Sequence, residues 1–271
     1  MLDSMLNFLA IASYLATASL LWRRLANANN IGGRTKLGVI SLGFIAALLH
    51  AVILYSSMRV DGGLNLGFTS AVSLVTWVIV VLFLATALSK PIENLGIFIM
   101  PMAAVTVLLA WAWPSRNIPA PYTSALSFSH IIISILAYSL LTIAVVQSLM
   151  LSIQERHLRH KQPGGFMHTL PPMQTMEQLM FQMIALGFFL LTLTLISGIF
   201  FSEAVFGKPL MFTHHIVLSL FAWLVFAILL VGRWRFGWRG RNAIRWTVSG
   251  FTLLALAYFG SKFVLEILLG R

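Results

Sequence analysis

Long apolar runs separated by short polar connections make up almost the whole chain. A helix needs about 20 apolar residues to cross the hydrocarbon core of a bilayer. Eight runs approach or exceed that length: 5–22, 37–58, 66–88, 95–113, 127–153, 177–201, 213–232 and 244–268. Because backbone polar groups inside lipid must be paired within the segment, each run predicts a helix. The pattern therefore predicts an all-α polytopic membrane bundle of about eight transmembrane helices, one domain over residues 1–271.

Basic residues are distributed unevenly between the two sets of connections. Those after the first, third, fifth and seventh runs hold 13 of the 18 Lys and Arg residues, whereas the others hold only Arg59, Arg116 and Lys208. Loops rich in Lys and Arg stay on the cytoplasmic side. We therefore expect both termini to face outward, toward the periplasm. The net charge of +11 then reflects topology and anionic lipid, and requires no nucleic acid.

The amino-acid composition limits the kinds of catalytic and binding site that the chain can form. The chain is 59% hydrophobic and 9% charged, whereas soluble domains average about 25% charged residues. It has no cysteine, which excludes disulfides, thiolate metal sites and thiol catalysis. No GxSxG, HExxH or phosphate-loop motif occurs, and no carboxylate lies deep in a predicted span. No catalytic residue is therefore predicted, and a proton-coupled transporter is disfavoured.

Four histidines fall within or at the edge of the predicted spans: His50, His130, His214 and His215. Ionisable residues at membrane depth indicate function by default. From the predicted topology, all four lie in the outer half of the bundle. A single histidine in a bundle can equally be a core residue bonded to a Ser, Tyr or carbonyl. His214 and His215, at the start of a helix, can also be interfacial residues.

Two of these histidines share a helix face with small or polar residues. The face of His130 continues at helical spacing through Ser134, Ala137 and Tyr138, and that of His50 includes Gly43, Ala46 and Ala47. Small residues let a helix approach a backbone or a flat ligand closely. Two imidazoles across such a gap would suit a haem iron with axial nitrogen ligands. We therefore predict His50 and His130 as metal ligands, with His214 as a further cofactor-binding candidate.

Several segments also resemble a known family. "SHIIISILAYSLLT" (129–142), "GFFLLTLTLISGIFF" (187–201), "GWRGR" (237–241) and "LAYFGSKF" (256–263) follow the order found in the cytochrome c assembly family. The resemblance extends over the whole chain and is greatest to the YpjD-type inner-membrane branch. It implies a polytopic haem-handling protein of the bacterial inner membrane that binds haem b. It also implies that His130 is the outward-facing haem ligand, with His50 as its partner.

One expected feature of that family is missing. Its tryptophan-rich WWD segment should fall in residues 202–216, which read "SEAVFGKPLMFTHHI" without a tryptophan, and a later family histidine corresponds to Val231. The resemblance therefore implies an accessory or regulatory role in cytochrome c biogenesis rather than a complete haem lyase. The expected partners are haem, membrane lipid and another inner-membrane protein. Two alternatives stay open: a haem-free structural or regulatory subunit, and a small-molecule or lipid transporter.

Overall fold

The structure is a computed structural model that describes residues 2–26, 33–60, 63–114, 119–120, 125–159, 170–200 and 214–264. Most of these residues lie in long helices. The helices are α1 (Leu2–Ala26), α2 (Gly33–Met58), α3 (Phe68–Ser89), α4 (Gly96–Ala112), α5 (Ala125–Arg159), α6 (Met173–Phe200), α8 (His214–Phe236) and α9 (Gly240–Ala255). A short helical turn, η1 (Glu93–Leu95), precedes α4, and a π-helical turn, η3 (Leu256–Gly260), continues α9.

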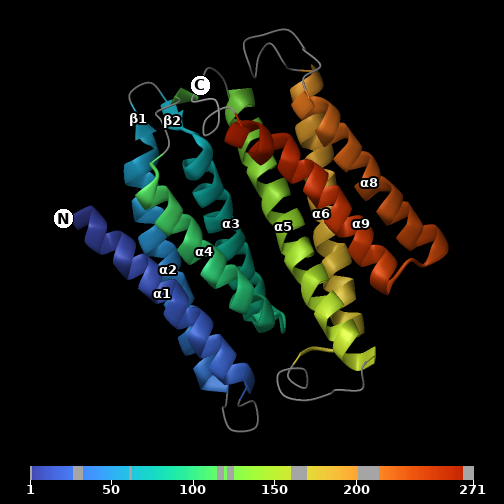
Figure 1. The fold of residues 1–271 in the computed structure, drawn as a ribbon, viewed down its shortest axis with the longest axis horizontal. Coiled ribbons are helices and arrows are strands. Elements are labelled where there is room, and N and C mark those ends of the chain that lie inside the picture. The colour runs from blue at the N-terminus through green and yellow to red at the C-terminus, as the bar shows by residue number, and fades with distance from the viewer. Residues whose placement is uncertain are drawn as a thin grey trace.

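The helices form two groups that lie side by side (Figure 1). In the first group, α1 and α3 each pack on both α2 and α4. In the second, α5 packs on α6 and α9, and α8 contacts α6 and α9. Contacts between α3 and α5 join the groups. The end of the bundle at which α1, α5 and α8 terminate is here named the basic end. The opposite end, where α5 and α8 begin, we call the histidine end.

The predicted polytopic helical fold is confirmed. Seven of the described helical segments are long and apolar enough to cross a membrane: Asp3–Ala26, Lys36–Met58, Phe68–Ser89, Glu93–Ala112, Ala125–Leu158, Met173–Ile199 and His214–Phe236. The eighth predicted run, 244–268, differs. It is helical from Gly240, but the regular α-helix ends at Ala255, and its first turns expose Arg241 and Arg245. Residues 265–268 of that run lie outside the described residues.

The "GWRGR" segment makes the turn from α8 into α9. Gly237 and Gly240 have φ values of +65° and +54°, a region that side chains with a Cβ rarely adopt. The Gly237 N–H donates to the Arg233 carbonyl at 3.2 Å, which closes the C-terminus of α8. A Cβ on Gly232 would lie 2.4 Å from the Trp238 ring. The glycines therefore let Trp238 pack directly on the backbone of α8.

Short antiparallel strands close the histidine end beside α2 and α4 (Figure 1). The strands β1 (Arg59–Val60) and β2 (Gly63–Asn65) pair with Arg59 opposite Leu64, and β3 (Pro119–Ala120) adds to β2 with Leu64 opposite Ala120. Hydrogen bonds between the strands thereby pair backbone N–H and C=O groups in the segments that follow the helices. The sheet joins the connection after α2 to the connection after α4.

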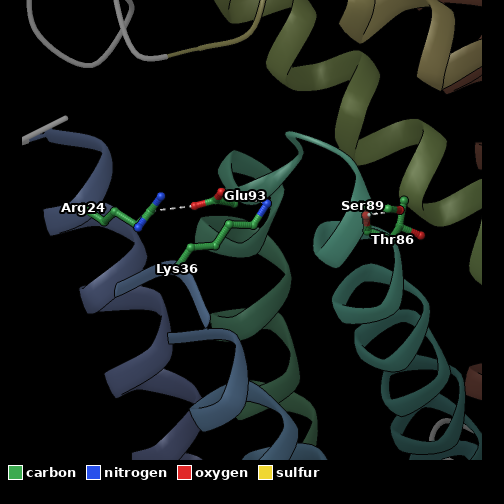
Figure 2. Close-up of polar contacts among 5 residues, drawn as sticks. All are labelled: Arg24, Lys36, Thr86, Ser89 and Glu93. Atoms are coloured by element: carbon green, nitrogen blue, oxygen red, sulfur yellow. Dashed lines mark hydrogen bonds and ion pairs between the residues drawn. The ribbon is translucent and has the colours of Figure 1, made fainter. Parts of the chain in front are cut away.

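Ion pairs fasten helices together at the basic end. Glu93 accepts a hydrogen bond from Arg24 Nε at 2.8 Å and lies 3.3 Å from Lys36 Nζ. Figure 2 shows both cations pointing at this carboxylate from α1 and α2. In the second group, Arg233 on α8 donates to Glu177 on α6 at 2.7 Å. Each helix group therefore has its own ion pairing between helices at this end.

Candidate functional site

His50 is fully buried, and both of its ring nitrogens have partners. Nδ1 lies 3.0 Å from the Tyr14 hydroxyl on α1, and Nε2 lies 2.8 Å from the Ser73 hydroxyl on α3. A neutral imidazole has one donor and one acceptor nitrogen, and a hydroxyl can serve either. The polar capacity of His50 is therefore satisfied by protein, and the side chain joins three helices.

The small-residue face of α2 packs against protein. A Cβ on Gly43 would lie 2.8 Å from Leu84 Cδ2 of α3, and Ala46 and Ala47 are buried. The Ala47 carbonyl accepts a hydrogen bond from Trp77 Nε1 at 2.8 Å. Close packing of α3 therefore accounts for these small residues.

His130 has a different environment, near the start of α5. Its ring is partly buried, and Nδ1 lies 2.7 Å from the Ser197 hydroxyl of α6. Ser197 in turn donates to the Thr194 carbonyl at 3.0 Å. Because the Ser197 hydroxyl can donate one hydrogen bond and accept others, it can accept from Nδ1–H while it donates to the Thr194 carbonyl. A second residue of the predicted stripe, Ser134, donates back to the His130 carbonyl at 2.6 Å.

The His130 ring lies close to Gly198 of α6. A Cβ at Gly198 would sit 3.5 Å from His130 Cε1, at ordinary van der Waals distance. The rest of the predicted stripe is buried in the second helix group: Ala137 is fully buried, and the Tyr138 hydroxyl donates to the Leu254 carbonyl of α9 at 2.7 Å. The stripe therefore packs α5 against both α6 and α9.

His215 is the histidine that lies near His130. It is partly buried at the start of α8 and within electrostatic range of His130. Its ring meets the Tyr258 ring edge-on, with centroids 6.2 Å apart, and Tyr258 lies 5.8 Å from Tyr138. His214 is exposed beside it. We call His130, Ser197, His215 and Tyr258 the outer cluster; α5, α6, α8 and η3 each contribute one member.

The structure thus places His215 within electrostatic range of His130, whereas the two ring nitrogens of His50 bond to Tyr14 and Ser73. The pairing of His50 with His130 as ligands stays a prediction. Ser197 and Tyr258 were not predicted, although the small pair Ser197-Gly198 in "LISGIF" is a signal of close helix approach.

No group of three or more His, Cys, Asp or Glu side chains that could hold a metal ion occurs in the described part of the chain. Within 202–216, where the WWD segment is expected, residues 202–213 lie outside the described residues. Metal-ligating histidines commonly bond their other ring nitrogen to a neighbouring group, as His130 Nδ1 does with Ser197. Imidazoles of this kind are the axial nitrogen ligands of many haem irons.

Comparison with known proteins relates this architecture to one family. The family described as "Cytochrome C assembly protein" matches residues 39–269. The chain is 32% identical to the inner membrane protein YpjD of Escherichia coli K12 over 266 residues, which cover 96% of this chain and 97% of the relative. It is also 24% identical to the protein HemX of Brevibacillus brevis, over 68% of this chain and 69% of HemX.

A more local similarity links the chain to a cytochrome c biogenesis protein, CcsA of Synechocystis, with 34% identity over 86 residues that cover 32% of this chain and 26% of CcsA. The match to the family extends over most of the chain, and the relative from Escherichia coli is similar along nearly its full length. The chain therefore belongs to the cytochrome c assembly protein family.

Proposed function

We propose that this chain binds a b-type haem at the outer cluster and serves as an accessory or regulatory haem-handling protein of the bacterial inner membrane. One observation carries this proposal: the partly buried His130 ring, oriented by its 2.7 Å contact with the Ser197 hydroxyl, lies within electrostatic range of His215. Family membership supports a haem-related role in cytochrome c biogenesis. The positive-inside pattern supports a periplasmic location for the histidine end.

His130 is the proposed axial ligand from α5, and His215, at the start of α8, is the proposed second ligand. The contact between Nδ1 and the Ser197 hydroxyl restricts the orientation of the ring, as outer partners of metal ligands do. The Tyr258 and Phe259 rings, 5.2 Å apart, offer aromatic surface next to the cluster. When bound, haem supplies an iron whose redox and spectral properties depend on these axial ligands.

Residues 202–216 support the accessory assignment. This segment contains no tryptophan, so the aromatic platform expected from the family resemblance is missing there. The relatives named for cytochrome c biogenesis share only about a third of the chain, whereas the YpjD relative spans nearly all of it. A protein that holds haem without that platform suits haem storage, sensing or the stabilisation of a membrane partner better than delivery to apocytochrome c.

Absorption spectroscopy tests the proposal. The full chain, purified in detergent from haem-replete cells, should show a Soret band that shifts on reduction. His130→Ala should remove the band, and His215→Ala should remove or strongly shift it. His157→Ala is the matched control, since His157 is exposed near the other end of the same helix, where its Nδ1 lies 2.9 Å from the Ile153 carbonyl oxygen. It should leave the spectrum unchanged.

The same experiment tests the predicted role of His50. If His50 is an axial ligand, His50→Ala removes the Soret band as completely as His130→Ala does. If it joins helices, the band persists while the protein loses stability. A colourless wild-type preparation would refute haem binding and favour the haem-free subunit.

A further inference from the structure

A polar cleft opens between α5 and α9 at the basic end, far along α5 from the outer cluster. Its volume is about 720 Å³, and both helices contribute side chains to its walls. The lining residues are Ser152, Glu155, Arg156, Arg241, Ile244, Arg245, Val248 and Ser249. Three arginines and one carboxylate give these walls a formal charge of +2.

The three arginines of the cleft are unpaired within the described residues. Arg156, Arg241 and Arg245 are exposed, and none of them has a carboxylate within 4.0 Å there. Elsewhere at the same end, Arg24 and Arg233 do pair with carboxylates, on Glu93 and Glu177. The cleft therefore concentrates guanidinium groups whose donors are available to an anion.

The rest of the cleft is suited to an amphiphile. Arg241, Arg245 and Ser249 follow one another at helical spacing on the exposed side of α9, whereas Ile244 and Val248 lie deeper. An exposed polar stripe on a helix packed among membrane spans is unfavourable against lipid tails. A ligand with an anionic head and apolar chains would cover both parts of this surface.

We propose that this cleft binds the headgroup of an anionic phospholipid that carries two phosphates, such as cardiolipin. The planar guanidinium fork bonds phosphate oxygens in pairs. Basic pockets between transmembrane helices on the cytoplasmic side bind such headgroups, and the basic end is the one that the topology predicts to be cytoplasmic. The charge of +2 matches two phosphates. This site is separate from the outer cluster and does not depend on haem binding.

Native mass spectrometry of the full chain in detergent, titrated with tetraoleoyl cardiolipin, tests the proposal. The wild type should retain one lipid. Arg241→Gln combined with Arg245→Gln should weaken binding at least about tenfold, because two charge-assisted contacts are lost. Arg23→Gln combined with Arg235→Gln removes the same charge from exposed positions outside the cleft and should change binding less than about twofold. Ser249→Trp should weaken binding by filling the cleft without changing charge.

Three outcomes would overturn the proposal. Equal loss in the Arg23 and Arg235 control would mean that a diffuse basic surface attracts lipid. Unchanged binding in both the Arg241/Arg245 variant and Ser249→Trp would place the lipid elsewhere. Sodium pyrophosphate that binds the lipid-free protein as tightly as cardiolipin does would identify a free phosphate compound as the ligand. Failure of pyrophosphate to compete, together with loss in both cleft variants, supports the lipid site.

Discussion

His50 and His130 lie in the two helix groups and differ in how completely the protein surrounds them. Each bonds to a serine hydroxyl on another helix, at 2.8 Å for Ser73 and 2.7 Å for Ser197. His50 has a second partner in Tyr14 and no exposed surface, whereas His130 is partly exposed and has His215 nearby. The same residue type thus joins helices in the first group and forms a candidate site in the second.

The difference follows from where each histidine lies along its helix. His50 is well inside α2, with α1 and α3 packed on either side of it. His130 is close to the start of α5, and the beginning of α8 contacts η3 nearby. An ionisable residue at membrane depth indicates function by default. Burial and hydroxyl partners at both ring nitrogens give His50 a role in joining helices that does not require a ligand.

Replacement of His50 should give the largest loss of stability. His50→Ala leaves the Tyr14 and Ser73 hydroxyls without their partner and opens a cavity among three helices. We expect the free energy of unfolding to fall by about 3 kcal/mol. Denaturant titration of the detergent-purified protein, followed by circular dichroism, measures this change.

His130→Ala is the matched comparison, because it truncates the same side chain at the partly exposed position. It should lower the free energy of unfolding of the haem-free protein by less than about 1 kcal/mol. Equal losses for the two variants would contradict the distinction between a helix-joining and a site histidine. A larger loss for His130→Ala would mean that His130, rather than His50, is the helix-joining histidine.

The ion pairs at the basic end extend the comparison to the two helix groups. Glu93 pairs with cations from both α1 and α2, whereas Glu177 pairs with Arg233, which also donates to the Trp238 carbonyl and lies over the Phe181 ring. Glu93→Gln should therefore lower the free energy of unfolding by about 1.5 kcal/mol. Glu177→Gln should have about half that effect, because Arg233 keeps two other contacts.

Salt provides the control for this pair of variants. The side chains involved are partly exposed, so the effect of each substitution should shrink at about 1 M salt, where charge interactions are screened within about 3 Å. An effect of Glu93→Gln that is independent of salt would mean that packing, rather than charge, joins α1, α2 and η1. An equal effect of the two substitutions would contradict the greater role of Glu93.

Much of the fold could be predicted from the sequence because membrane spans are specified by length and apolarity alone. Seven of the eight predicted runs correspond to helices that are long and apolar enough to cross a membrane. The exception, at 244–268, is informative. Arg245 and Ser249 lie on an exposed polar side of α9. A count of apolar residues over the whole run does not detect that side. The "GWRGR" turn could be recognised, but its packing of Trp238 onto Gly232 required the structure.

The arrangement of the site was less predictable. Helical periodicity shows which residues share a face, but it does not show which helix that face meets. The small residues around His50 and around His130 give the same signal in sequence. In the structure, Leu84 of α3 lies against Gly43, whereas the His130 ring itself lies against Gly198. Partner choice depends on contacts between distant segments, such as Tyr14 with His50, and periodicity contains no information on these.

The smallest expected effect comes from removing one hydroxyl at each histidine. Tyr14→Phe removes a bond to the fully buried His50, and we expect a loss of about 1 kcal/mol. Ser197→Ala removes the bond to His130 Nδ1, where partial exposure gives access to a replacement partner, so a loss of about 0.5 kcal/mol or less is expected. Thermal unfolding of the haem-free proteins compares the two.

Spectroscopy then separates stability from function. If His130 ligates haem, Ser197→Ala should shift the Soret band or weaken haem retention about tenfold, as the loss of an outer partner of a metal-ligating histidine does. Tyr14→Phe should leave the band in place. The reverse pattern would be a spectral change in Tyr14→Phe and none in Ser197→Ala. It would mean that His50 is the ligand, and that hydroxyl partners at both ring nitrogens do not prevent a histidine from binding a metal.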